Sequence, residues 1–406
     1  MAKKMTGRER VRATLNHQEP DQVPMDIWIT MDSYVALRRE LGLSPRVAKP
    51  WDWQNTPNAI KVGSTTWSTD TRVEVDVIEK LDLDIIRRSS YPPNDGRGFV
   101  YHPDEDLYYD EWGVPHRRAE FETGYGGAHF EIARYPLAEA TIDDLESYPW
   151  PDPRDPSFLG DLPEEIPWLY KETPYAIHCQ LGRGGIYEQA KYLRGFEQLF
   201  IDMAIDKEFV HALFSKLLEI ELEMNRIGIE AVGKYLNTLR VSPEDLGTQT
   251  SLLVSPEINE ELVRPYYKKR FHAVREMLNE VGNSECKIMY HSCGAVRPLL
   301  PWLVEDGMNI FDPLQPLEVD DGQPARFKRD FGDRISFLGG INVQSTLPRG
   351  TPEDVRAEVR QRIKEMAPGG GYILSPAHRM LPDIQFRNIK AMYEAGREYG
   401  KYPLNL

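Results

Sequence analysis

The sequence contains few cysteines and no long apolar run. Three cysteines in 406 residues form an odd, sparse set, which argues against a disulfide framework and is typical of a reducing compartment. No stretch approaches the roughly eighteen apolar residues that a membrane-spanning helix needs. The basic opening MAKKMTGRERVRATL is not followed by the apolar segment of a signal peptide. We therefore expect a cytoplasmic protein with no membrane partner.

Basic residues are also fewer than acidic residues. The chain has 49 Lys and Arg against 64 Asp and Glu, for a formal net charge of −15. This balance repels phosphate backbones and anionic lipid surfaces, which argues against nucleic acid or membrane as the main partner. Hydrophobic residues at 41% and charged residues at 28% are ordinary for a globular protein with a sizeable core. The oligomeric state stays open, a homodimer included.

Short apolar runs alternate with amphipathic helical stretches after residue 174. Such alternation predicts strand–helix units and hence a parallel sheet. Two earlier segments, 22–30 and 81–90, bring the strands to about eight, which predicts a closed (β/α)₈ TIM barrel. An open doubly wound sheet is the alternative, but no G-x-G-x-x-G opens a helix to support its dinucleotide-binding form. The six later strands are expected at YAIHCQL, VGKYLNTLRV, CKIMYHSC, NIFDPL, ISFLGGIN and GYILSPAH.

The pattern of residue types changes between about residues 96 and 156. Aromatic and charged residues alternate there as they do in β-hairpins, and the stretch ends in the proline-rich YPWPDPRDP. We predict a hairpin-rich insertion on a single barrel domain that spans residues 1–406. A separately folded cap of roughly sixty residues is the alternative.

Polar side chains recur where the predicted strands end, and in a barrel of this kind the active site lies at those ends. We expect His178, Asp312 and Asn342 to contact the substrate from these positions. Cys286, at the beginning of its strand, is expected to be an inert core residue. The full set of polar residues at the strand ends is His178, Cys179, Asp245, His291, Cys293, Asp312, Asn342 and His378.

The segment Tyr290-His291-Ser292-Cys293-Gly294 is the most informative. Residues two apart in an extended chain point to the same face, so His291 and Cys293 bring an imidazole and a thiolate to one point. Both are preferred zinc ligands, and a catalytic zinc needs three protein ligands with one open position. His378 ends another strand and would be the third ligand. Ordinary strand packing around a hydrogen-bonded histidine is the alternative for an isolated H-x-C.

Three further residues have a chemical and a structural interpretation. Asp245 is expected to act as a displaceable fourth ligand or a general base beside the metal, or else as a helix N-cap. Glu244 competes with Asp245 for either role, including that of metal ligand. Arg183, in the glycine-rich GRGGIYE, would clamp a carboxylate or phosphate, or else lies in a flexible loop. The aromatic residues near Trp112 would cover a flat substrate, or simply pack on the barrel wall.

With these residues identified, the chain resembles the uroporphyrinogen decarboxylase superfamily, which includes the corrinoid-dependent (cobalamin) methyltransferases. The resemblance covers nearly the whole length and implies a (β/α)₈ barrel. The motifs that carry it are RERVRATLNHQEPDQVPMDIW, DLYYDEWGVP, LRGFEQLFIDM, DLGTQTSLLVSPE, HSCGAV, FLGGIN and PAHRMLPDIQFRNIKAMYEA.

Within this superfamily the resemblance favours the methyltransferase branch. The decarboxylases need no metal and carry an arginine-rich N-terminal motif of the type RQAGRYLPEY, whereas the matching stretch here reads DSYVALRREL. The H-x-C-G pattern marks the methyltransferases and implies zinc on His291 and Cys293. Thiol-methylating members have a cysteine as third ligand, where SPAHRM here places His378. A zinc ion with one thiolate is the better Lewis acid and the poorer activator of a thiol.

The resemblance thus implies a zinc-dependent methyltransferase. It would move a methyl group from a small-molecule donor, best a methoxylated aromatic compound, to the cobalt of a corrinoid carried by a separate protein. This reaction is an O-demethylation. The alternatives are a decarboxylase acting on a porphyrinogen or similar polyacid, a methylcobamide:thiol methyltransferase, and a catalytically silent barrel that serves as a scaffold. The sequence does not identify the methyl donor or the direction of transfer.

Overall fold

A parallel sheet of seven strands forms the centre of the computed structural model, which describes residues 4–44, 71–90, 100–120, 128–317 and 323–405. The predicted α/β architecture is confirmed, because each of these seven strands pairs in parallel with its neighbours in the sheet. In sheet order the strands are β1 (Ile85–Ser89), β6 (Ala176–Gln180), β7 (Thr238–Arg240), β8 (Lys287–His291), β9 (Ile310–Leu314), β10 (Ser336–Ile341) and β11 (Tyr372–Pro376).

The N-terminal segment 22–30 lies between the two ends of this sheet. Met25 forms a parallel bridge with Leu374 of β11. On the opposite side the amide of Asp84, just before β1, donates to the Met25 carbonyl at 3.0 Å. The segment therefore takes the eighth place in a TIM-barrel-like arrangement. It does so through isolated bridges and not as the regular strand we expected, and Pro24 within it has no N–H to give a ladder.

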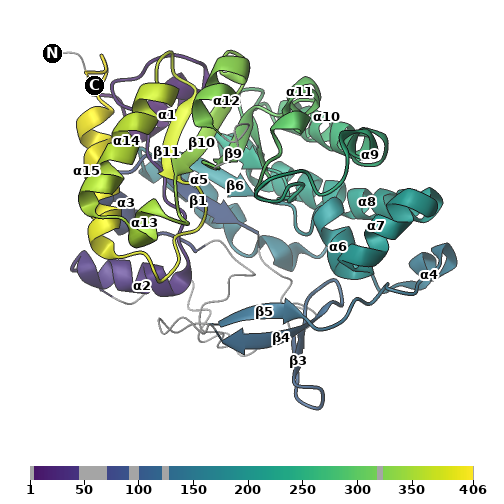
Figure 1. Cartoon of the computed structure of the whole chain (residues 1–406). Helices are drawn as coiled ribbons and strands as arrows, with labels where there is room; N and C mark the ends of the chain where they lie inside the picture. The colour runs from purple at the N-terminus through teal and green to yellow at the C-terminus, as the bar shows by residue number, and fades with distance from the viewer. Residues whose placement is uncertain (1–3, 45–70, 91–99, 121–127, 318–322, 406) are drawn as a thin grey trace.

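The helices form an outer layer around the sheet (Figure 1). α1 begins with a capping box, in which the Thr6 side chain and the Glu9 side chain satisfy each other's backbone amides. The helices are α1 (Gly7–Leu15), α2 (Met31–Glu40), α3 (Val75–Leu81), α4 (Ile142–Ser147), α5 (Leu162–Glu172), α6 (Tyr187–Arg194), α7 (Phe196–Ile205), α8 (Lys207–Val232), α9 (Pro256–Ile258), α10 (Arg264–Glu280), α11 (Leu300–Glu305), α12 (Pro324–Phe331), α13 (Thr346–Arg349), α14 (Pro352–Met366) and α15 (Phe386–Tyr399).

The aromatic stretch after residue 99 forms a second, smaller sheet. Its four antiparallel strands are β2 (Val100–His102), β3 (Leu107–Tyr109), β4 (Pro115–Glu120) and β5 (Ala128–Ile132). Figure 1 shows this sheet below the barrel strands. From 133 to 156 the chain holds only the short α4 and irregular segments. The parts of the expected insertion at 96–99 and 121–127 lie outside the described residues.

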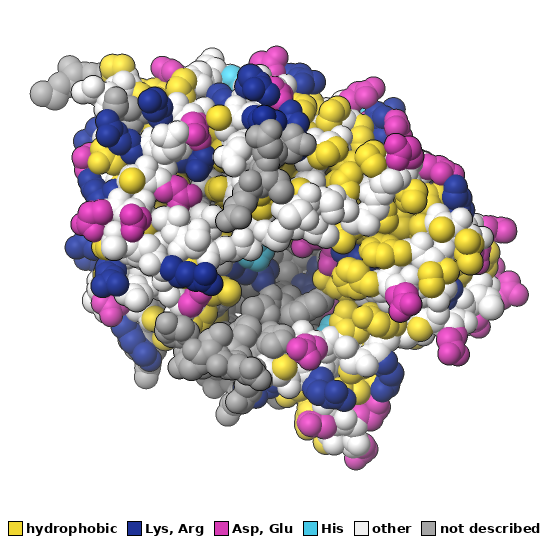
Figure 2. Space-filling model, in the orientation of Figure 1, with side chains coloured by type: hydrophobic (Ala, Val, Ile, Leu, Met, Phe, Trp, Pro, Cys, Tyr) yellow, Lys and Arg dark blue, Asp and Glu magenta, His cyan; other side chains and the backbone are white. Residues whose placement is uncertain are grey.

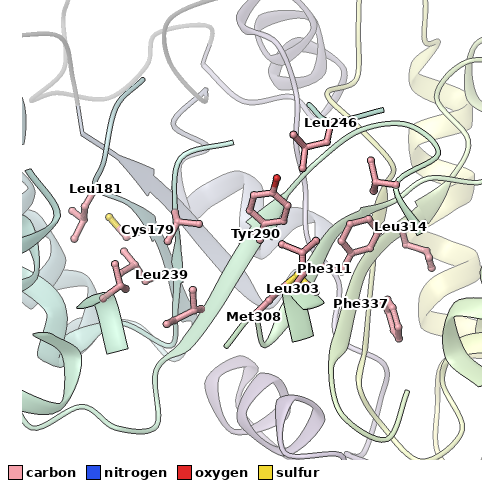
Figure 3. Close-up of a cluster of buried hydrophobic side chains, with 14 of the residues drawn as sticks. Cys179, Leu181, Leu239, Leu246, Tyr290, Leu303, Met308, Phe311, Leu314 and Phe337 are labelled. Carbon is pink, nitrogen blue, oxygen red and sulfur yellow. The ribbon is translucent and has the colours of Figure 1, made fainter. Parts of the chain in front are cut away.

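Alternate residues along the barrel strands face opposite sides, and this alternation separates core from site. One set packs outward beneath the helices, and Figure 3 shows Cys179, Leu239, Tyr290, Phe311 and Phe337 within this cluster. The other set faces the interior of the barrel. At its lower end the interior is apolar, where side chains of β1, β6, β8, β9, β10 and β11 pack with Val11 and Leu15 of α1. The polar side chains lie nearer the carboxyl ends of the strands.

Candidate metal centre

His291 is the last residue of β8, and Cys293 follows two positions later on the same face. The Cys293 Sγ and His291 Nε2 atoms are 3.4 Å apart. His378 comes two residues after the end of β11, and its ligand nitrogen completes a group in which all three ligand atoms lie within 4.8 Å of one another. The three predicted ligands therefore converge. Gly294 turns the chain away at φ +88°, where a Cβ would lie 2.5 Å from a backbone oxygen of Thr248.

Asp312 on β9 fixes the orientation of the His291 ring. Its Oδ2 lies 2.8 Å from His291 Nδ1, and both side chains are buried. Burial acts to raise the pKa of the Asp312 carboxyl, but His291 and the Arg240 guanidinium hold it well below its usual range. The carboxylate therefore accepts the Nδ1 proton and leaves Nε2 directed toward Cys293. Outer-shell carboxylates commonly hold metal-binding histidines in this way. Asp312, predicted to contact substrate, is placed behind the ligand instead.

The second histidine is held in its neutral form. Burial, His291 and Arg379 together lower the pKa of His378 to about 3. A neutral imidazole has the lone pair that a metal ligand needs. The indole of Trp28 packs against both ligand rings, with centroid separations of 5.3 Å to His291 and 4.8 Å to His378. Trp28, in the N-terminal segment 22–30, thus fixes the positions of both imidazole rings.

The donor set fits a zinc ion. Zinc bonds of the usual length place the ligand atoms of a tetrahedral site about 3.3–3.8 Å apart. The 3.4 Å between Sγ and Nε2 falls in this range, and all three ligand atoms lie within a wider limit of 4.8 Å. Burial and the carboxylates of Asp245 and Asp312 raise the pKa of the Cys293 thiol well above its ordinary value. A dication bound by these residues would offset those carboxylates and favour the thiolate form of Cys293. With one thiolate and two imidazoles as ligands, a tetrahedral zinc ion would have one coordination position open.

Asp245 lies at the edge of this centre. Its Oδ1 accepts the Cys293 amide at 2.8 Å and lies 3.9 Å from His291 Nε2, while its side chain is 46% exposed. Partial burial acts to raise its pKa, but His291, the Cys293 amide and Lys191 bring the pKa below the ordinary value. The helix N-cap interpretation is wrong, because the next helix begins at Pro256 and is capped by Ser255.

Glu244 lines the cavity, but its carboxylate oxygens are engaged in structural contacts. Its side chain is 0% exposed and accepts the backbone amides at the beginning of α6, from Ile186, Tyr187 and Glu188, at 3.1, 2.5 and 2.9 Å. It also pairs with the buried Arg270. Because all of these contacts engage its two oxygens, Glu244 fixes the loop that carries Asp245. The sequence could not distinguish the two adjacent carboxylates, since both follow the same strand.

Of the other three residues predicted to bind substrate, Arg183 lies inside the site, and His178 and Asn342 lie outside it. Arg183 lines the cavity beside the centre and pairs with Glu111 at 2.5 Å. The buried His178 contacts Thr238 Oγ1 at 2.8 Å and does not line the cavity. The Asn342 side chain accepts the amides of residues 344 and 345, so it stabilises a turn and is likewise outside the cavity lining.

The cavity above the centre has a volume of about 380 Å³. Figure 2 shows one face of the molecule hollowed near its centre, with histidine and basic side chains in view. Trp28, Arg240 and Arg379 also line the cavity and were not predicted. Arg240 is the last residue of β7, where the strand-end rule would have found it, whereas Trp28 lies in a segment without a regular strand. The described lining residues are Trp28, Ser89, Ser90, Asp110, Glu111, Trp112, Gln180, Arg183, Gly184, Glu188, Gln189, Tyr192, Arg240, Pro243, Glu244, Asp245, His291, His378 and Arg379.

The sequence pattern of one family, described as uroporphyrinogen decarboxylase (URO-D), matches residues 129–399. The chain belongs to this family. Among the URO-D relatives, a uroporphyrinogen decarboxylase of Pseudoalteromonas translucida is 23% identical over 68% of this chain and 75% of its own length. The methylcobamide:CoM methyltransferase MtaA of Methanosarcina barkeri is 26% identical over 43% of this chain and 47% of its own.

A methylated-thiol–coenzyme M methyltransferase of Methanosarcina mazei is 28% identical, over 65% of each chain. The chain thus spans less than two thirds of either of these two methyltransferases. Among solved structures, a methyltransferase from Methanosarcina mazei superposes with a TM-score of 0.61 at 16% identity, covering 97% of this chain and 99% of its own. That likeness supports the barrel fold. In the described part of the chain, every helix is too short or too polar to cross a bilayer.

Proposed function

We propose that this URO-D family member is a zinc-dependent methyltransferase that transfers a methyl group from a methoxylated aromatic compound to the cobalt of a separate corrinoid protein. The observation that carries the proposal is the convergence of His291, Cys293 and His378 on one point at the carboxyl end of the barrel. The relatives named as methyltransferases, one of them for methylcobamide, support the reaction class.

A zinc ion on these ligands would supply Lewis acidity, which stabilises negative charge developing on a leaving oxygen. In the transfer the methyl–oxygen bond breaks and its electron pair stays with the oxygen, while cobalt(I) supplies the pair for the new carbon–cobalt bond. The chain's own residues position the substrate and control protons. Asp312 keeps the His291 ring in place, and Asp245 lies at the cavity edge to take part in proton exchange with solvent or to occupy the open position.

The cavity walls suit a flat aromatic substrate. Trp28, Trp112 and Tyr192 line it, and Gly184 lets Trp112 approach closely, since a Cβ there would lie 2.6 Å from the indole. Aromatic walls with a few polar groups are typical of small-molecule sites. These side chains would hold the aromatic ring of the substrate so that its methoxy carbon points out of the barrel, where the corrinoid of a partner protein has access. Fixing that alignment supplies much of the catalysis in a bimolecular transfer.

A thiol acceptor is the second candidate, because two relatives carry coenzyme M in their names. It predicts that His378 is dispensable, since activation of a thiol gains little from a second imidazole. A decarboxylase, as in the relative from Pseudoalteromonas translucida, predicts activity without any metal. The alternatives therefore differ from our proposal in whether the reaction requires a metal and whether it requires His378.

Metal analysis of the purified protein tests the proposal. We expect about one zinc per chain, lost in Cys293→Ala and His378→Ala but kept in Cys286→Ala, a matched buried cysteine at the opposite end of a strand. The zinc-containing protein should transfer methyl from methoxylated aromatics to free cob(I)alamin, followed by the cobalamin spectrum. Zinc absent from the wild type, or transfer unaffected by Cys293→Ala, would refute the proposal.

A further inference from the structure

The exposed face of α7 is mostly apolar. Phe196, Ile201 and Ile205 are 38, 40 and 80% exposed, and Ala204 is exposed between them. Glu197 is the one charged side chain among the exposed residues of this helix. A surface helix of a globular protein normally turns its polar residues to solvent. Apolar residues gathered on the outside of a helix are typical of a contact with another macromolecule.

This apolar face extends to both sides of α7. Tyr135, which is 38% exposed, lies against the beginning of the helix, since a Cβ on Gly195 would be 3.0 Å from its ring. At the other end, Lys207 pairs with Glu261 at 2.7 Å and so links α7 to the turn that follows α9. Figure 2 shows hydrophobic side chains gathered beside the hollow, in the area that α6, α7 and α9 occupy in Figure 1. We define the α7 surface as residues 135–147, 196–208 and 251–261.

The exposed charge of the α7 surface is almost entirely negative. Lys207 is the one basic residue in its three segments, and it is paired with Glu261. Arg134 and Arg264, which border the segments, form ion pairs as well. The exposed carboxylates of the surface are Glu139, Asp143, Asp144, Glu146, Glu197, Asp206, Glu208, Glu257, Glu260 and Glu261.

This charge favours one kind of partner over another. A two-fold contact between copies of the chain would place the same acidic side chains against each other, which opposes self-association. A different protein that carries basic side chains around an apolar patch would be attracted instead. The charge and the apolar residues of the α7 surface therefore match such a protein.

The α7 surface adjoins the cavity beside the metal centre. α6 contributes Tyr192 to the cavity lining and leads into α7 with only Gly195 between the two helices. On the side of α9, the Thr248 carbonyl accepts the Ala295 amide at 2.8 Å, so the chain before α9 lies beside the loop that follows the ligand Cys293. A protein that presents cobalt to a substrate in this cavity must sit on the surface around the cavity, and the α7 surface is part of that surround.

We propose that the α7 surface is the docking site of the corrinoid protein, and that this partner contacts it with an apolar patch surrounded by basic side chains. The inference rests on the proposed function, which requires such a partner, and adds where the partner binds. Burial of the apolar face would stabilise the complex, and the opposite charges would speed its formation.

Binding of corrinoid proteins tests the inference without turnover. The probes are the corrinoid proteins of the same organism, each purified, loaded with hydroxocobalamin and applied to the immobilised enzyme in biolayer interferometry. We expect one of them to bind, with an association rate that falls as the salt concentration rises from about 50 to about 500 mM. Ile201→Lys and Ile205→Lys should each weaken its binding about tenfold or more, because they put positive charge opposite basic residues and remove apolar contact.

A matched control separates docking from a general effect of the substitution. Trp168→Lys replaces another large apolar side chain, 56% exposed on α5 and outside the α7 surface, and should bind the corrinoid protein as the wild type does. All three variants should keep the zinc content and the methyl transfer to free cob(I)alamin of the wild type, since none of these residues lines the cavity.

Three results would overturn the inference: no binding by any of the corrinoid proteins, wild-type affinity in both α7 variants, or a wild-type dimer in sedimentation that Ile205→Lys dissociates. The last would assign the surface to a second copy of the chain. Docking that both α7 variants weaken, in an enzyme that transfers no methyl group to free cob(I)alamin, would support the docking site and refute the proposed function alone.

Discussion

Replacing Asp312 by Asn should weaken zinc binding without removing any ligand atom. The carboxylate is 1% exposed and accepts the His291 Nδ1 proton at 2.8 Å. Asn preserves the shape but lacks the charge that makes the imidazole a stronger donor. Loss of such an outer-shell partner costs about 10- to 100-fold in metal affinity, or roughly 1.4–2.8 kcal/mol.

The change should also reduce stability, because the buried Arg240 loses the negative charge of Asp312 at 3.6 Å. Breaking a buried ion pair costs about 3–5 kcal/mol, although the 3.6 Å separation places this pair toward the lower end. The two effects are separated by a matched control. Asp306 is likewise fully buried and pairs with Arg264 at 2.8 Å, away from the cavity. Asp306→Asn should lower the unfolding free energy and leave zinc affinity unchanged.

Zinc affinity is measured by competition with a chromophoric chelator at neutral pH, and stability by urea unfolding of the metal-free proteins. At neutral pH the Asp312 carboxyl is ionised in the wild type, since its pKa is held below the ordinary value. Its contribution to stability is therefore fully present there and would be lost only in strong acid. If Asp312→Asn binds zinc as tightly as Asp306→Asn does, the carboxylate does not support His291 as argued.

Three further changes follow from the same contacts. The pKa of His378 is lowered to about 3 in the folded protein. The metal-free protein should therefore lose stability as the pH falls from about 6.5 toward 3, because the unfolded state takes up the proton first. Thermal unfolding of His378→Gln should show a flatter pH dependence. Glu244→Gln should cost about 3 kcal/mol of stability in chemical unfolding, because a buried arginine and three amides lose a charged partner. Gly184→Ala, at φ +89° and 2.6 Å from Trp112, should weaken aromatic ligand binding in calorimetry while zinc content stays unchanged. Gly42→Ala, also at positive φ but in open space, is its control and should affect neither.

The residues that the sequence predicted to converge, and that do lie together in the structure, are those whose positions follow from strand geometry. His291 and Cys293 meet because extended chain has a period of two, and His378 joins them because the carboxyl ends of parallel strands lie on one face of the barrel. The later strands were likewise predictable, because apolar runs bounded by helices have few other arrangements.

The residues that the sequence did not resolve depend on distant partners. Glu244 and Asp245 are adjacent and of one chemical type, but α6 and Arg270 bury the first while the second stays half-exposed. Trp28 lies in a segment whose partner, β11, is more than 300 residues further along the chain. Such pairings are decided by the closure of the barrel, which local patterns do not encode.

The same side chains also resemble a nucleophilic cysteine relay, because Cys293 Sγ is 3.4 Å from His291 Nε2 and the other ring nitrogen is held by Asp312. Electrostatics argues against that chemistry. Nucleophilic cysteines have a lowered pKa, whereas burial, Asp245 and Asp312 raise the pKa of this thiol. A relay also has no use for His378, whose ligand nitrogen is directed at the same point. A dication would use all three donors, and its charge would offset the two carboxylates that keep the thiol protonated. The arrangement that makes Cys293 a poor nucleophile is therefore the one that a metal ion completes.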